Sequence, residues 1–151
     1  MTATTPRSVT PPAAWRDPVT LAEFAPLVDL ADGEDLADLA PPPRANGAHN
    51  RGELMLWALC SGRYNRPFRG RRVIGAPGIA AMLGLKVQTV RLYASRRNRS
   101  FPRPVFTITP RGLTVPLYDL GEVRAWGVQI RALAADGVTP QRRRRAAASA
   151  R

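Results

Sequence analysis

Residues 76 to 96 read A-P-G-I-A-A-M-L-G-L-K-V-Q-T-V-R-L-Y-A-S-R, and they decide how the middle of the chain folds. The pattern predicts a short helix that ends near Gly84, followed at once by a second helix. Glycine at the break permits a backbone with positive φ, so the two helices can cross at a steep angle. Apolar residues would fill the wedge between the helices: Ile79, Ala80, Leu83, Leu85 and Val90. Such a pair is either a helix-turn-helix, whose second helix can enter the major groove of DNA, or an ordinary helical hairpin in a globular core.

The residues that follow favour the first alternative, because they predict a β-hairpin. V-F-T-I-T at 105–109 alternates like a strand, and the next residues, Pro110, Arg111 and Gly112, have the composition of a tight turn. L-T-V-P-L-Y at 113–118 would be the returning strand, with Pro116 at an edge or a strand end. A hairpin after a helix-turn-helix is a wing, and this one would carry Arg111 at its tip, against phosphates or the minor groove.

A closing helix is predicted after the hairpin. Asp119 and Glu122 have the spacing of a capping box. Apolar residues then recur at three- and four-residue steps: Leu120, Val123, Trp126, Ile130 and Leu133. The expected fold class is therefore mainly α with a small β-hairpin wing, that is, a winged helix-turn-helix core with disordered tails.

Four motifs in this region resemble the winged helix-turn-helix of the MerR superfamily, especially its small excisionase and AlpA-like branch. They are G-I-A-A-M-L-G-L at 78–85, T-V-R-L-Y at 89–93, F-P-R-P-V at 101–105 and L-Y-D-L-G-E-V-R-A-W at 117–126. By this resemblance, Arg91 and Tyr93 match the arginine and the aromatic residue of the family's second helix, and Tyr118 matches the tyrosine that closes the wing. Two positions depart from the family pattern. Gly78 stands where an acidic residue is common, and Lys86 replaces the usual serine or threonine helix cap.

The charge of the chain favours a polyanionic partner. It carries 23 Lys and Arg against 11 Asp and Glu, a formal net charge of +12. From residue 41 to 118, Glu53 is the only acidic residue among 14 basic ones, whereas seven of the 11 acids lie between Asp17 and Asp38. This asymmetry is typical of a nucleic-acid-binding body with an acidic appendage. Since 22 of the 23 bases are arginine, part of that content is expected to reflect high-GC codon usage.

The winged domain is expected to span residues 50–135. An extra helix at 51–61 is expected at its start, before the helix-turn-helix. That helix is apolar nearly all round, which predicts burial against the closing helix or in a dimer seam. Residues 1–45 are expected to be a disordered or partly helical acidic segment, with a candidate capping box at Thr20 and Glu23. This segment is either a solvated linker or an interaction segment that recruits a protein or folds back on the basic face. Residues 136–151 are expected to be a basic disordered tail.

The candidate DNA-contacting residues lie on the second helix, directly after it and at the wing tip: Lys86, Gln88, Thr89, Arg91, Tyr93, Arg96, Arg97, Arg99 and Arg111. Gln88 and Arg91 are expected at base edges, because glutamine suits adenine and arginine suits guanine in the major groove. The family resemblance leaves a phosphate contact as the alternative for Arg91. The other residues would hold the DNA backbone, with Arg111 touching it from the wing.

The stretch R-Y-N-R-P-F-R-G-R-R at 63–72 is a second candidate for DNA contact. Arginines on an extended, proline-containing arm suit insertion into a narrow minor groove. A plain solvated basic linker explains the composition equally well. The residues of the candidate minor-groove arm are Arg66, Arg69, Arg71 and Arg72.

Catalysis, a metal site and a cofactor are not expected. The chain has one histidine, His49, and one cysteine, Cys60, and it lacks a Gly-rich phosphate loop and paired carboxylates in the core. Cys60 is expected to be a buried small hydrophobe rather than a nucleophile. No apolar run resembles a signal peptide or is long enough to span a membrane, which predicts a cytoplasmic, nucleoid-associated protein.

Double-stranded DNA is thus the expected partner. MerR-type regulators usually carry a long dimerising helix and a ligand domain after the winged module. Only about 25 residues follow Trp126 here, from which no effector pocket is expected. The resemblance therefore implies an excisionase-like architectural factor of a phage or mobile element, which binds repeated sites, self-associates along DNA and steers a recombinase. The alternatives are a small transcriptional regulator that acts on RNA polymerase and a non-specific nucleic-acid-binding or packaging protein.

Overall fold

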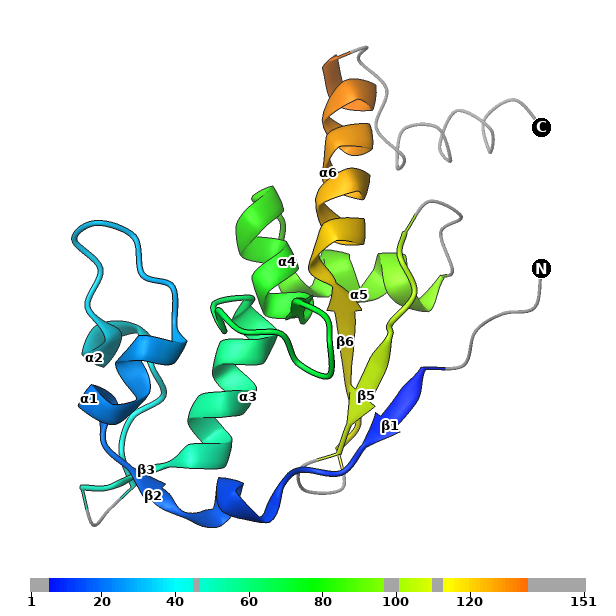
Figure 1. The fold of residues 1–151 in the computed structure, drawn as a ribbon. Helices are drawn as coiled ribbons and strands as arrows, with labels where there is room; N and C mark the ends of the chain where they lie inside the picture. The colour runs from blue at the N-terminus through cyan, green and yellow to red at the C-terminus, as the bar shows by residue number, and fades with distance from the viewer. Residues whose placement is uncertain (1–5, 45–46, 97–100, 110–112, 136–151) are drawn as a thin grey trace.

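A mixed β-sheet links the two halves of the chain (Figure 1). The computed structural model describes residues 6–44, 47–96, 101–109 and 113–135. Within these residues a four-stranded sheet has the order β1-β5-β6-β4. Its strands are β1 (Arg7–Val9), β4 (Val73–Ile74), β5 (Phe106–Ile108) and β6 (Val115–Asp119). β5 and β6 are antiparallel, β6 and β4 are antiparallel, and β1 runs parallel to β5. The predicted hairpin is therefore present, but within a larger sheet than a wing alone, so the fold combines α and β structure.

The first central helix, α3 (Arg51–Ser61), has the bounds that the sequence predicted. At its start the backbone N–H of Glu53 donates to Asn50 Oδ1 at 3.1 Å, and at its end Gly62 takes a left-handed conformation with φ of 74°. Leu54 and Leu59 are fully buried. The sequence predicted burial of α3 against the closing helix or in a dimer seam, and the closing helix is not among its main partners. Its main partners are the N-terminal 3-10 helix η1 (Ala13–Arg16), β4 and α4.

Two further helices form the predicted pair around Gly84. α4 (Ala76–Leu83) ends at Gly84, whose φ is 68°, and α5 (Val87–Ser95) begins three residues later. The backbone N–H of Leu85 donates to the Ala80 carbonyl at 2.9 Å and closes the turn. All five predicted wedge residues are buried or half-buried here: Ile79, Ala80, Leu83, Leu85 and Val90. The predicted helices and their glycine turn are confirmed.

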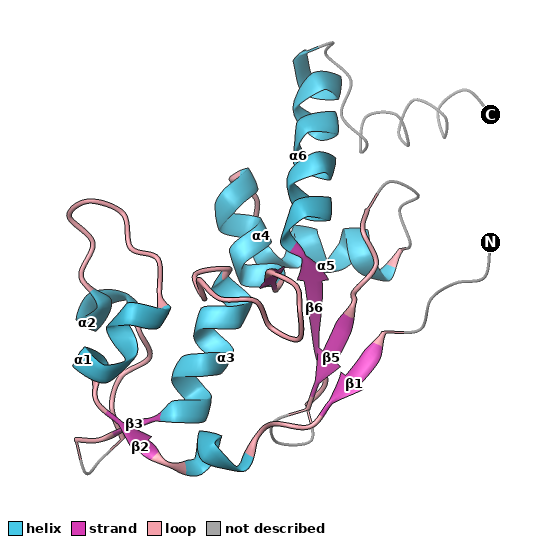
Figure 2. Ribbon diagram, in the orientation of Figure 1, coloured by secondary structure: helices cyan, strands magenta, loops and turns pink. Residues whose placement is uncertain are grey.

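The hairpin leads directly into the closing helix, α6 (Leu120–Ala135). Pro116 pairs with Thr107 of β5. The short strand β4 pairs only with Tyr118 and Asp119 of β6. Because β4 does not reach Pro116, the missing N–H of this proline costs no hydrogen bond between β6 and β4. The predicted cap is present, because the Glu122 N–H donates to Asp119 Oδ1 at 3.1 Å. From there α6 extends away from the sheet (Figure 2). The turn at 110–112 and the side chain of Leu133 lie outside the described residues.

Residues 6–44 differ most from the sequence prediction, since they belong to the folded body. They form β1, η1, β2 (Pro18–Val19), α1 (Leu21–Phe24), η2 (Ala25–Leu27) and α2 (Leu36–Leu39), and β2 pairs with β3 (His49–Asn50). Their apolar side chains enter the core: Val9, Trp15, Val19, Phe24, Val28 and Leu36. The segment is partly helical, as expected, and the predicted cap of α1 is present, with the Glu23 N–H donating to Thr20 Oγ1 at 3.1 Å. The core thus begins well before residue 50, because these isolated apolar residues are buried by α3 and β5.

Two hydrophobic clusters lie on opposite faces of the sheet. Val73 and Leu117 join the cluster formed with α3 and the N-terminal segment, whereas their neighbours Ile74 and Tyr118 join the cluster formed with α4, α5 and α6. This alternation follows from the two-residue repeat of β-strands. The second cluster anchors α5 through Val90 and leaves the opposite side of this helix exposed.

Candidate nucleic-acid interface

α5 presents one continuous polar stripe to solvent. Val90 is fully buried and therefore fixes how the helix is rotated about its axis. The opposite side holds exposed residues at helical spacings of three and four: Gln88, Arg91, Leu92 and Ser95. Leu92 is 46% exposed and adds an apolar side chain to this exposed side. Leu92 and Ser95 were missed from the sequence, although their spacing from Gln88 and Arg91 placed them on the same side.

The structure keeps some of the other predicted contact residues near this stripe. Lys86 precedes α5 as its N-cap, without a side-chain capping bond, and Arg96 follows it as the C-cap; both are exposed. Thr89 is half-buried. Tyr93 is also half-buried, because its ring packs edge-on against Trp126 with centroids 5.7 Å apart. Arg97, Arg99 and Arg111 lie outside the described residues.

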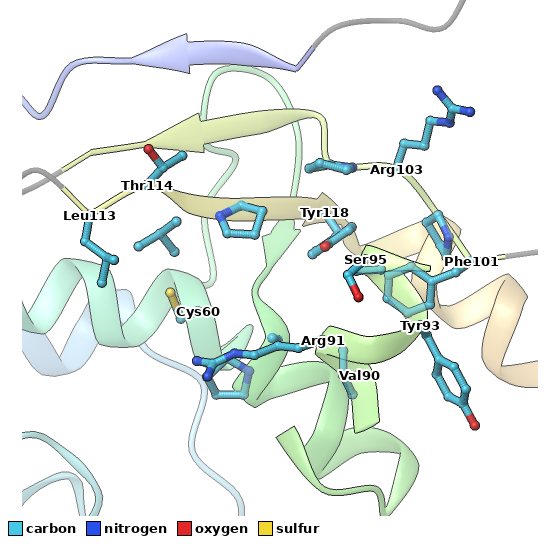
Figure 3. Close-up of a pocket in the computed structure, with 17 residues that line it drawn as sticks. Cys60, Val90, Arg91, Tyr93, Ser95, Phe101, Arg103, Leu113, Thr114 and Tyr118 are labelled. Atoms are coloured by element: carbon cyan, nitrogen blue, oxygen red, sulfur yellow. The ribbon is translucent and has the colours of Figure 1, made fainter. Parts of the chain in front are cut away.

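A groove of about 900 Å³ separates α5 from the β5–β6 hairpin (Figure 3). Apolar side chains form most of its walls, among them Val90, Phe101, Val115, Pro116 and Tyr118. Arg91 extends from α5 along the groove toward Cys60, and Arg103 stands at the other end with its guanidinium pointing outward. Among the described residues that line the groove there is no carboxylate. The groove is therefore apolar inside and cationic at its borders.

Cys60 lines this groove, whereas His49 lies elsewhere in the fold. Burial raises the pKa of the Cys60 thiol to about 11, so the thiol stays protonated at neutral pH and is a poor nucleophile. This agrees with the prediction of a packed small hydrophobe, although Cys60 is half-buried rather than fully enclosed. His49 lies in β3 opposite Val19. Among the described residues, no three His, Cys, Asp or Glu side chains could hold a metal ion together.

The stretch 63–72 is folded against the body and is no extended arm. The Asn65 N–H donates to the Leu27 carbonyl at 2.9 Å. Phe68 and Arg71 exchange two backbone hydrogen bonds of 2.7 and 3.1 Å around a two-residue turn. The Phe68 ring meets the Phe106 ring edge-on, with centroids 5.9 Å apart. The contacts with Leu27 and Phe106 join residues far apart in the sequence, so the basic composition alone could not reveal them.

The acidic N-terminal segment neutralises part of this stretch. Both terminal nitrogens of Arg63 donate to the Glu34 carboxylate, at 2.9 and 2.8 Å. The hydrogen bond from Arg63, followed by one from the Ala31 N–H, lowers the pKa of Glu34 from 4.5 to about 2. Arg72 approaches Asp29 at 3.4 Å. Of the two predicted actions of this segment, folding back occurs, but onto residues 63–72 and not onto α5. In the described part of the chain no carboxylate forms an ion pair with the bases of α5.

A second basic surface lies at the far edge of the sheet. It is a hollow of about 350 Å³ whose lining includes Arg7, Arg69, Arg71, Arg103 and Glu122. Arg71 is partly neutralised by Asp119, at 3.4 Å. Arg7 reaches this hollow because β1 pairs in parallel with β5, a contact between residues about a hundred positions apart that sequence spacing could not reveal. Of the candidate arm residues, Arg66 is exposed outside this hollow and Arg72 is turned toward Asp29.

No protein-family model, no curated protein and no solved structure matches the chain. In the residues that the structure describes, no helix is both long enough and apolar enough to cross a membrane.

Proposed function

We propose that the chain is a sequence-specific DNA-binding protein in which α4 and α5 act as a helix-turn-helix and the β5–β6 hairpin acts as its wing. The observation that carries the proposal is the exposed stripe of α5, with Gln88 and Arg91 next to each other on it and Lys86 and Arg96 at its two ends. An α-helix fits the major groove, where glutamine and arginine side chains can form paired hydrogen bonds to adenine and guanine.

Three residues of the stripe, and the bases at its two ends, have roles that their chemistry suits. Gln88 and Arg91 read base edges, with a phosphate contact as the alternative for Arg91. Leu92 offers an apolar surface to a thymine methyl group, which accounts for its exposure on a polar stripe. Lys86 and Arg96 contact phosphates at either end of the helix. The arginines of the hollow beside β1 extend this phosphate surface, since Arg103 borders both the hollow and the groove.

The distribution of ion pairs supports the choice of this surface. Glu34 and Asp29 are paired with Arg63 and Arg72, away from α5. Cations without a protein carboxylate nearby gain most from contact with phosphates, because DNA binding then releases counterions without breaking an ion pair. We therefore expect the affinity for DNA to fall steeply with salt concentration.

Two biological roles are compatible with such binding. The excisionase-like role predicts direct repeats of the site, adjacent protein copies and bent DNA. A small transcriptional regulator is the second candidate, favoured by the groove beside α5, because a ligand there could alter the DNA-reading helix. A regulator would protect a palindrome that overlaps a promoter.

The test is selection of bound fragments from the source genome at physiological salt, followed by footprinting of the recovered DNA. We expect a short motif protected in the major groove. Gln88→Ala should relax the preference at one base pair by roughly 1–3 kcal/mol. Gln129→Ala is the matched control, since Gln129 is an exposed glutamine on α6 and should leave the motif unchanged. Recovery of random fragments that are all lost together as salt rises would contradict the proposal and favour non-specific packaging.

A further inference from the structure

We infer that the groove between α5 and the β5–β6 hairpin binds a small amphipathic anion, namely an organic acid with an aromatic or branched apolar body. This site goes beyond DNA binding and does not depend on it. The groove volume of about 900 Å³ lies within the range of pockets that enclose small organic ligands. The residues that line the groove all precede Trp126, whereas the expectation from the sequence concerned an effector pocket built after Trp126.

The apolar part of the groove is held in place before any ligand arrives. Phe101 contacts Trp126 edge-on at 4.9 Å and Tyr118 edge-on at 5.4 Å between ring centroids. Trp126 and Tyr118 are themselves almost fully buried, so the ring of Phe101 has little freedom. Proline rings contribute further rigid surface: Pro77, Pro102, Pro104 and Pro116. A wall that is already ordered loses little conformational entropy on binding, which favours a ligand with a flat or branched apolar body.

The charged part of the groove selects an anion. Arg91 lies along the groove, Arg103 stands at its end, and the described part of the lining contains no carboxylate (Figure 3). Within the described residues neither arginine takes part in an ion pair. A carboxylate or sulfonate can form a two-point, charge-assisted hydrogen bond with a guanidinium. A neutral apolar ligand would leave Arg91 without this partner, whereas a DNA phosphate alone would leave the apolar walls exposed to water.

Occupancy of the groove should reduce DNA binding, a consequence that rests on the proposed function. An anion held by Arg91 would cancel a charge that DNA otherwise contacts. Because such coupling is reciprocal, DNA should lower the affinity for the anion by the same factor. The groove would then act as an inhibitory effector site beside the reading helix.

The site can be tested without DNA, using two fluorescent probes. Anilinonaphthalene sulfonate has an aromatic body and one negative charge, and N-phenyl-1-naphthylamine has nearly the same body without the charge. We expect the full-length chain to bind the sulfonate at one site. Arg91→Ala should weaken sulfonate binding roughly tenfold and leave binding of the neutral probe unchanged. Ser95→Trp, at an exposed position that lines the groove, should abolish binding of both probes. Arg131→Ala, an exposed arginine of α6 outside the groove, is the control for total charge.

The proposed site would be wrong if Arg91→Ala and Arg131→Ala weakened sulfonate binding equally. It would also be wrong if Ser95→Trp bound both probes as well as the natural chain does. Circular dichroism of each variant checks that the fold is retained. Adding the sulfonate to a DNA titration of the natural chain then tests the coupling, which should appear with the sulfonate and not with the neutral probe, because only the sulfonate cancels the charge of Arg91. Probe binding in the groove together with unchanged DNA affinity would overturn the coupling and support the site. Absence of any specific DNA binding before the probe is added would instead overturn the proposed function.

Discussion

Gly78 shows how one position without a side chain sets the distance between two helices. A Cβ atom built there would lie 2.5 Å from the backbone carbon and oxygen of Ser61 and 2.6 Å from Ile74 Cγ1. The end of α3 therefore meets α4 directly at this residue. No side chain fits between the two helices at this position. This is a physical reason why Gly78 stands where the MerR superfamily, which the sequence resembles, commonly has an acidic residue.

Replacing Gly78 with alanine should destabilise the protein although alanine is the better helix former. The added methyl group must push the backbone of Ser61 away, which should lower the free energy of unfolding by roughly 1–3 kcal/mol. Urea denaturation at equilibrium measures the change. Ala81→Gly, on the exposed side of α4, is the control for helix propensity alone. It should lower the free energy of unfolding by about 1 kcal/mol. A stabilised Gly78→Ala variant would mean that α3 and α4 are not in direct backbone contact.

Glu34 should make the stability of the protein depend on acid pH. Its pKa is about 2 in the folded chain against an ordinary 4.5, so its pairing with Arg63 stabilises the fold fully above pH 4.5. This contribution is lost as the pH falls through about 2. We expect Glu34→Gln to lower the urea midpoint at pH 7 and to match the natural chain near pH 2. Glu23→Gln, an exposed acid of α1, should show no such convergence. A constant difference from pH 7 to pH 2 would exclude the ion pair as its cause.

Among the local elements, the turn at Phe68–Arg71 carries a strained residue. Arg69 has φ of 49° and Gly70 has φ of 84°, the combination found in tight two-residue hairpins that favour Asn-Gly. Arginine is disfavoured with positive φ, so Arg69→Asn should raise the free energy of unfolding by about 0.5–1 kcal/mol. Thermal and urea unfolding measure this gain. Arg66→Asn, an exposed change in the same stretch without positive φ, should stay within about 0.5 kcal/mol of the natural chain. No gain from Arg69→Asn would show that the turn is not strained.

Elements with a local signal were predictable, and elements made by distant contacts were not. α3, the α4–α5 pair, the hairpin and the start of α6 each combine periodic apolar residues with a cap, a glycine or a turn. β1 and β4 have three and two residues and exist only because β5 and β6 lie beside them. The same holds for the candidate site. Helical spacing was enough to predict that Gln88 and Arg91 are exposed on one side of α5. The groove and the hollow depend instead on how the hairpin and β1 are placed, which no local pattern reveals.

The stability of the whole protein depends on its N-terminal segment, residues 6–44. Phe24 is fully buried in the cluster that α3 and the sheet share. Phe24→Ala should therefore lower the free energy of unfolding by about 3–5 kcal/mol, as expected for a large side chain removed from a packed core. Leu30→Ala, at a position that is 38% exposed, should cost about 1 kcal/mol or less. Equilibrium unfolding of both variants gives the comparison. Equal, small losses would mean that residues 6–44 do not belong to the cooperative fold.

The distribution of charge over the chain makes a last prediction about DNA binding. If phosphates are contacted by the bases around α5, then each contact contributes about −0.9 to the slope of log affinity against log salt concentration. Arg96→Ala should weaken binding to all sequences alike and make this slope shallower by about 0.9. Arg124→Ala removes the same charge from the exposed side of α6 and should leave the slope unchanged. Titration of a recovered DNA site at several salt concentrations measures both. If the two variants lose slope equally, the DNA responds to the net charge of +12 and not to a surface built around α5.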